Sequence, residues 1–206
     1  MTAVKRNTKI ARMTLLALLV AVLIVLAFVN IPMPMGLSIT FNMIPVAIAA
    51  MAMGVPGGMI VGGAFGLISF LQCYGIFGVS GMGVALVTAN PSFGFAMLML
   101  VQRFVSRVLV GVLAALVFRG MERTKAPMVV KGMVTGFSAA FFNTLFFMTL
   151  LVLLFGQTEF IQNQMAGRSV MAYLIASVGV NAVVEMIVAA LVTGAAGAAL
   201  KKARLI

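Results

Sequence analysis

Long apolar runs, separated by short polar segments, are the feature that most restricts the fold of this sequence. Of its 206 residues, 64% are hydrophobic and only 8% are charged, whereas roughly a quarter of the residues in a soluble domain are charged. A helix needs about 20 apolar residues to cross a bilayer, so six crossings and short loops use the whole length. We predict an all-α membrane protein, a single domain over residues 1–206, with six transmembrane helices at about 13–29, 41–53, 59–74, 95–118, 128–155 and 170–200.

Basic residues at the ends of the apolar runs predict the orientation of this bundle. If both termini lie in the cytoplasm, cytoplasmic segments carry eleven of the 14 cations and the outer loops carry only Arg168. The eleven are Lys5, Arg6, Lys9, Arg12, Arg119, Arg123, Lys125, Lys131, Lys201, Lys202 and Arg204. Cytoplasmic loops are enriched in Lys and Arg, so we expect cytoplasmic N- and C-termini in a cell membrane, the prokaryotic plasma membrane.

The first apolar run follows four cations, as a signal peptide would. It extends from Met13 to Val29, which is longer than a typical signal-peptide core, and no small-x-small cleavage site follows it. We therefore expect it to be retained as the first span.

Charge and residue usage argue against several classes of function. A net charge of +11 would suggest nucleic acid as the partner of a soluble protein, but here the cations flank apolar runs, so the partner is the lipid bilayer. Histidine is absent and Cys73 is the only cysteine. An internal disulfide is therefore impossible, a His- or Cys-based metal site is disfavoured, and we expect no cofactor.

Three ionisable residues fall within the predicted spans, where charge is costly and therefore points to function. Arg103 and Arg107 are four residues apart and share one helix face. Arg107 lies about 18 Å below the outer end of its span at 1.5 Å per residue. Glu185 shares a face of the last span with Asn181, and Asn143 lies at a similar depth in the fifth span.

Three interpretations of these polar residues at similar depth in the membrane remain open. The side chains could form a binding pocket for a small solute, or an Arg–Glu pair could lock the bundle, and a pocket could reuse such a pair. Alternatively, Glu185 could couple transport to protons. An active site is not indicated, because these residues include no nucleophile with an adjacent base and no second membrane carboxylate.

The first span carries Ala17 and Ala21, an Ala-x-x-x-Ala pattern. Small residues four apart let another helix approach closely. This face is consequently either a packing surface within the bundle or a docking surface for a partner subunit.

The order of several short motifs resembles the S components of energy-coupling factor (ECF) vitamin transporters. After the basic N-terminus and the Ala-x-x-x-Ala helix, the motifs are Ile44-Pro45-Val46-Ala47-Ile48-Ala49-Ala50, Gly54-Val55-Pro56-Gly57-Gly58, Gly63-Ala64-Phe65-Gly66-Leu67-Ile68-Ser69-Phe70, Asn90-Pro91, Arg107-Val108-Leu109-Val110-Gly111, Asn143-Thr144-Leu145-Phe146-Phe147-Met148 and Asn181-Ala182-Val183-Val184-Glu185. The resemblance covers nearly the whole chain, and the Arg107 and Asn143 motifs look most like the branch that includes pantothenate carriers.

The resemblance implies a non-enzymatic transport subunit without its own ATPase activity. Such a subunit binds a water-soluble vitamin and associates with a membrane coupling subunit and two cytoplasmic ATPases, with Ala17 and Ala21 as the docking face. The candidate substrate-binding residues are Arg107, Arg103, Asn143, Asn181, Glu185, Asn90 and Gln72. Pantothenate suits a buried Arg through its carboxylate, while cobalamin, riboflavin, folate and a thiamine or pyridoxine precursor remain open.

Two other functions compete with this interpretation. A stand-alone proton-coupled transporter would need no ATPase, although no internal repeat is visible. A structural or assembly protein would bind no small molecule.

Overall fold

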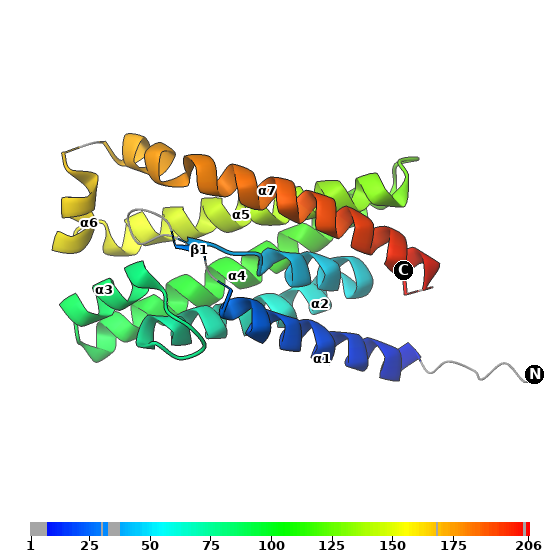
Figure 1. Cartoon of the computed structure of the whole chain (residues 1–206), viewed down its shortest axis with the longest axis horizontal. Helices are drawn as coiled ribbons and strands as arrows, with labels where there is room; N and C mark the ends of the chain where they lie inside the picture. The colour runs from blue at the N-terminus through cyan, green and yellow to red at the C-terminus, as the bar shows by residue number, and fades with distance from the viewer. Residues whose placement is uncertain (1–7, 30, 33–37, 168, 204) are drawn as a thin grey trace, which may run out of the picture.

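The computed structural model of the chain describes all residues except 1–7, 30, 33–37, 168 and 204, and within the last helix it leaves the side chains at 170, 171, 173–178, 180 and 181 undescribed. The described part is almost all helical (Figure 1). Five helices are long and apolar enough to cross a membrane. They are α1 (Thr8–Ala27), α2 (Met43–Leu71), α4 (Phe93–Glu122), α5 (Met128–Phe155) and α7 (Val170–Lys202).

Short elements connect these helices. They are the strands β1 (Ile31–Pro32) and β2 (Ser38–Ile39), a 3-10 turn (Gln72–Tyr74), α3 (Gly81–Ala89) and α6 (Glu159–Met165). The two strands pair antiparallel between α1 and α2. No helix was predicted between the spans 59–74 and 95–118, where α3 lies, because nine residues fall well short of a span and the segment has little amphipathic pattern.

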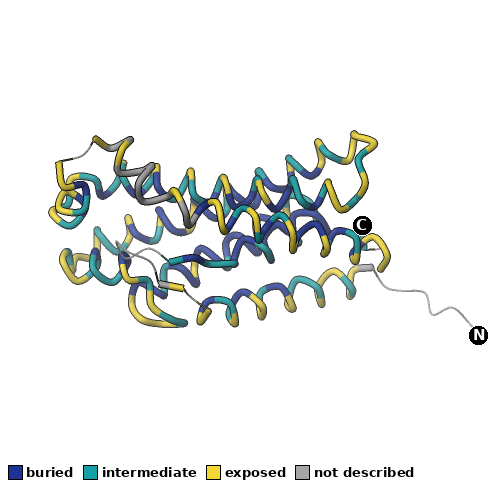
Figure 2. The backbone as a smooth tube through the Cα atoms, turned by 45° about the horizontal axis from the view of Figure 1, so that its top comes forward, coloured by how far each residue is buried: buried dark blue, intermediate teal, exposed yellow. Residues whose placement is uncertain are grey.

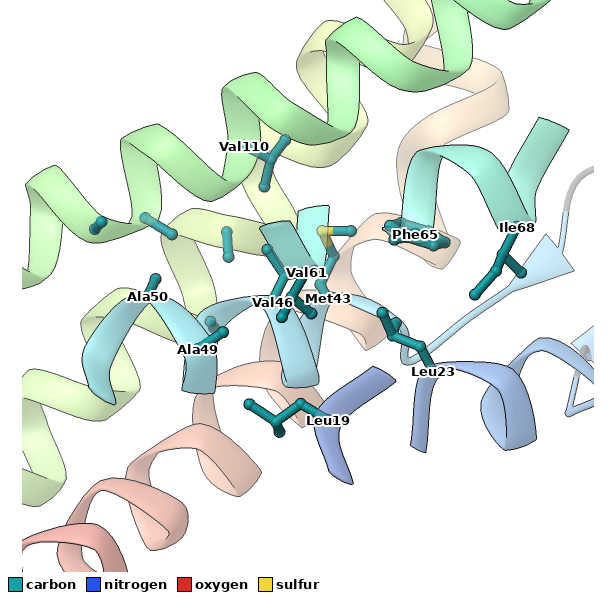
Figure 3. Close-up of a cluster of buried hydrophobic side chains, with 14 of the residues drawn as sticks. Leu19, Leu23, Met43, Val46, Ala49, Ala50, Val61, Phe65, Ile68 and Val110 are labelled. Atoms are coloured by element: carbon teal, nitrogen blue, oxygen red, sulfur yellow. The ribbon is translucent and has the colours of Figure 1, made fainter. Parts of the chain in front are cut away.

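Glycine 54 bends α2 into two arms. Its φ of 66° and ψ of −153° fall in a region that is essentially restricted to glycine. The second arm then runs back along the first, so that Val46 of the first arm lies beside Val61 of the second (Figure 3). The predicted spans 41–53 and 59–74 thus correspond to the arms of α2, which counts once among the five long helices.

Serine and threonine side chains cap the N-termini of four helices. Ser80, Ser92, Thr158 and Ser169 each accept a hydrogen bond from a backbone N–H in the first turn of α3, α4, α6 and α7, respectively. A cap of this kind satisfies an N–H group that has no partner within the helix. The caps explain why α4 begins at Phe93, two residues before the predicted span.

The second arm of α2 lies in close contact with α4. Gly58 and Gly111 face each other so closely that a Cβ on either would overlap the other's carbonyl group. One turn further along α2, a Cβ at Gly62 would lie 2.5 Å from the carbonyl oxygen of Arg107. The glycines of α2 therefore bring its backbone against the part of α4 that carries the arginines.

The core lies between α2, α4 and α5, and the outward faces of the helices are exposed (Figure 2). Large apolar side chains such as Phe93 and Leu153 are 80% and 73% exposed, which is the pattern of a lipid-facing surface. Only 17% of the apolar stretch of α1 is buried, so α1 lies at the periphery, packed on α2 through Leu19 and Leu23 (Figure 3).

Candidate functional site

Four consecutive inward-facing positions of α4 carry polar side chains at the centre of the bundle. Gln102, Arg103, Ser106 and Arg107 are all at most 5% exposed. The spacing of these positions keeps them on one face over two turns. Gln102 donates from Nε2 to the carbonyl oxygen of Phe147 on α5 at 3.1 Å, which fixes this face of α4 against α5.

Arg103 ties three elements together. Its guanidinium donates to the hydroxyl of Ser69 at the end of α2 (3.1 Å) and to the hydroxyl of Ser80, the cap of α3 (3.3 Å). Its Cζ lies 4.8 Å from the centroid of the Phe147 ring on α5. Both terminal nitrogens are therefore engaged in holding the fold.

Arg107 is placed differently. Its hydrogen bond runs to the Ser106 hydroxyl of its own helix (3.1 Å), and its Nε, like that of Arg103, is buried without a partner. Its Cζ lies 4.8 Å from the ring of Phe65 on α2 and 4.6 Å from the ring of Phe147. Two aromatic rings thus hold a guanidinium that has five N–H donors and few acceptors around it.

Asn143 lies on the same side of α5 as Phe147, because the two residues are one turn apart. It is 8% exposed, and its carbonyl oxygen Oδ1 has no hydrogen-bond partner. A polar acceptor is therefore buried beside the ring that both arginines contact.

Glu185 of α7 binds the backbone that leads into α2. Its Oε1 accepts a hydrogen bond from the N–H of Thr40 at 2.7 Å and a longer one from the Thr40 hydroxyl at 3.5 Å. No nitrogen of Arg107 lies within 4.0 Å of the Glu185 carboxylate. The locking Arg–Glu contact considered for this pair is consequently absent, and Glu185 holds the β2–α2 junction instead.

Asn42 is a further buried polar residue, and it was not among the predicted site residues. It precedes α2, is 1% exposed, and has no hydrogen-bond partner for either amide atom. Its signal in the sequence is weak, since an uncharged Asn before a helix ordinarily indicates a cap.

The two candidates at the ends of α2 and α3 have local partners. The Gln72 amide donates to the carbonyl oxygens of Ala27 (2.9 Å) and Phe77 (3.2 Å) and so joins the end of α1 to the turn after α2. The Asn90 amide donates to the Leu86 carbonyl oxygen of its own helix. The side chain of Asn181 lies outside the described part. The polar cluster therefore unites Arg103, Arg107 and Asn143 but not Gln72 or Asn90.

Ala17 and Ala21 lie on the exposed side of α1, away from the Leu19 and Leu23 face that packs on α2. Nothing in the described part of the chain covers them.

Among the described residues, no group of three His, Cys, Asp or Glu side chains is placed to hold a metal ion. The cluster instead offers buried cations, amides and aromatic faces. Such a set can hold an organic anion and hydrogen-bond its neutral groups.

Comparison with protein families identifies the family of the chain. The family model described as "ECF transporter, substrate-specific component" matches residues 11–195. The chain belongs to this family. The predicted S-component assignment is thereby confirmed, and every described member of the polar cluster lies inside the matched range.

Membership establishes the coarse function of the protein. An ECF S component is a substrate-specific subunit of a multi-pass membrane transporter; it binds a small substrate, associates with an ECF module and is not by itself a catalytic enzyme. No curated protein matches the chain.

Proposed function

We propose that this S component binds a carboxylate-bearing, water-soluble vitamin, with pantothenate as the leading candidate, and delivers it to an ATP-driven importer. The observation that supports this proposal is the state of Arg107, a buried cation whose one hydrogen bond stays within its own helix. A charge in the bilayer core is costly unless it has a function or a partner.

The two arginines divide their roles in this proposal. Arg103 is held by two hydroxyls from other elements and serves the fold. Arg107 presents its donors to the substrate, because a planar guanidinium matches a carboxylate with two parallel hydrogen bonds. The rings of Phe65 and Phe147 take up its faces, which leaves the N–H edge for the anion.

Asn143 supports pantothenate over a simple anion. Its unpartnered carbonyl oxygen can accept a hydrogen bond from a hydroxyl or amide, and pantothenate carries both beside its carboxylate. Folate carries carboxylates and an amide and is the second candidate, whereas riboflavin and cobalamin lack the carboxylate that Arg107 would bind.

The topology in this proposal has six crossings, with the two arms of α2 counted separately and both termini in the cytoplasm of a prokaryote. The split of eleven cations to one supports this orientation. Ala17 and Ala21 then form the face that meets the membrane coupling subunit, which in turn binds two cytoplasmic ATPases. Small side chains on an uncovered helix face permit the close approach that such docking needs.

The direct test is to purify the protein from cells and identify any bound small molecule by mass spectrometry, followed by calorimetric titration with pantothenate and folate. We expect a carboxylate-bearing vitamin to co-purify. A ligand without an anionic group would contradict the role of Arg107. Uptake that needs the proton gradient but no ATPase would instead favour the stand-alone transporter.

A further inference from the structure

Asn42 does not serve the helix that it precedes. Asn in the N-cap position ordinarily accepts a hydrogen bond from the first turn, but Asn42 makes no such bond with α2. The side chain is 1% exposed, and both its amide nitrogen and its carbonyl oxygen lack partners. A buried amide with neither atom satisfied is unfavourable for stability, so a structural role does not account for it.

The sequence neighbours of Asn42 contact residues of the polar cluster or pack near them. Two residues earlier, the N–H of Thr40 donates to Glu185 on α7. Met43, the residue after Asn42, packs in the same buried cluster as Phe65 (Figure 3). The guanidinium of Arg107 lies over the Phe65 ring. Asn42 is therefore flanked in sequence by a residue bound to the carboxylate of α7 and by a residue that packs in the same cluster as the ring beside Arg107.

The chemistry of a carboxamide restricts what it binds. It presents one N–H donor side and one carbonyl acceptor side by side. A group that satisfies both at once has the complementary edge, as an amide, a lactam or a similar ring edge does. Because Arg107 is proposed to bind an anion, Arg107 and Asn42 together select an organic anion that also carries an amide-type group.

We propose that Asn42 is a substrate-binding residue that holds an amide-type edge of the transported anion, and that Glu185 is a positioning residue that keeps Asn42 in place by binding Thr40. This inference rests on the proposed function of the Arg107 site and adds to it a second contact point and a narrower substrate class.

The first variant is Asn42→Leu, which replaces the amide with an apolar group of similar size. If Asn42 only supports the fold, this change lowers the melting temperature. If Asn42 binds substrate, the unbound variant melts at the same or a higher temperature, because an unsatisfied buried amide has been removed, while affinity falls at least about tenfold.

Thr193→Val is the matched control. Thr193 is also fully buried with an unpartnered hydroxyl, but it lies eight residues beyond Glu185 on α7, about 12 Å along the helix. Its replacement removes a buried polar group away from the cluster, so we expect the same or a higher melting temperature and unchanged substrate affinity.

The role of Glu185 is tested by a conservative pair. Glu185→Gln keeps an oxygen that can accept from the Thr40 N–H, whereas Glu185→Ala does not. We expect Glu185→Ala to weaken substrate binding at least about fivefold and Glu185→Gln to retain most of the affinity. Equal losses in both variants would show that the charge itself acts, which would overturn the positioning role.

The probes are pantothenate and panthenol, in which an alcohol replaces the carboxylate and the amide is retained, together with native mass spectrometry of the molecule that co-purifies with each variant. Asn42→Leu should weaken the binding of both probes by a similar factor. It should also lower the fraction of protein that co-purifies with bound substrate, while Thr193→Val does not.

If Asn42→Leu does not fold, Asn42→Ser takes its place. Normal binding by the folded Asn42 variant, or loss of folding in both variants, would overturn this inference alone. A wild-type protein that carries no small molecule and binds neither probe would overturn the proposed function as well.

Discussion

Replacement of Arg107 provides the sharpest test of the site, because Arg103 lies one turn away as an internal control. Arg107→Ala removes the buried cation that we assign to the substrate carboxylate. Loss of one partner from a buried charge pair costs about 2–5 kcal/mol, which corresponds to roughly 30- to several-thousand-fold weaker binding. Arg107→Lys retains the charge but loses the planar fork and its contacts with Phe65 and Phe147, so we expect an intermediate loss.

The two arginines should separate binding from stability. Arg107 makes its hydrogen bond within α4, so Arg107→Ala should change the melting temperature little. Arg103 bridges α2, α3 and α5 through Ser69, Ser80 and Phe147, and hydrogen bonds from a charged group are worth about 1.5–3 kcal/mol each. Arg103→Ala should therefore destabilise the protein by several kcal/mol.

The assay is calorimetric titration of folded, detergent-purified variants with the co-purified substrate, alongside their thermal unfolding. If Arg107→Ala binds as tightly as wild type, the polar cluster is not the anion site. If Arg107→Ala unfolds and Arg103→Ala does not, the division of roles between the two arginines is wrong.

Further predictions concern the amide, the partner, the topology and the packing. Asn143→Ala should weaken substrate binding by about 1–3 kcal/mol, the cost of a lost neutral hydrogen-bond partner, with Asn90→Ala as a control that leaves titrations unchanged. Replacement of Ala17 and Ala21 by Leu should reduce co-purification of the coupling subunit without weakening substrate binding; the opposite pattern would move this face into the pocket. In a Cys73→Ala background, cysteines at Lys125 and Lys201 should react only from the cytoplasm and one at Gln162 only from outside, and outside labelling at Lys125 would refute the six-crossing topology. Gly111→Val should lower stability by at least about 1–3 kcal/mol, because its Cβ would overlap the backbone of Gly58, whereas Gly120→Val, with open space around it, should cost little beyond helix propensity.

The sequence was informative about the long elements because the bilayer imposes a length and a composition on them. The apolar run that forms α5 extends from Met128 to Phe155, and its boundaries follow from a proline before it and a glycine after it. The helix α3 was missed because its nine residues carry no periodic pattern. The chain reverses direction between the two arms of α2 at one residue, Gly54. The sequence indicates a turn there, but it does not give the backbone angles that bring the second arm back along the first.

The polar residues of the bundle could be identified from the sequence through their cost in lipid, but their roles could not. Arg103 and Arg107 look alike on one helix face, and only the serines contributed by α2 and by the cap of α3 distinguish the arginine that holds the fold from the one with donors to spare. Glu185 was paired with Arg107 by depth alone, whereas its partner is a backbone N–H 145 residues away in sequence. The role of Asn42 likewise could not be predicted from the sequence. An uncharged amide before a helix resembles an ordinary cap until the structure shows that neither of its polar atoms is used. Charge therefore identified where a site can exist in this membrane, and the unpaired hydrogen-bonding groups are the ones that we propose to face the substrate.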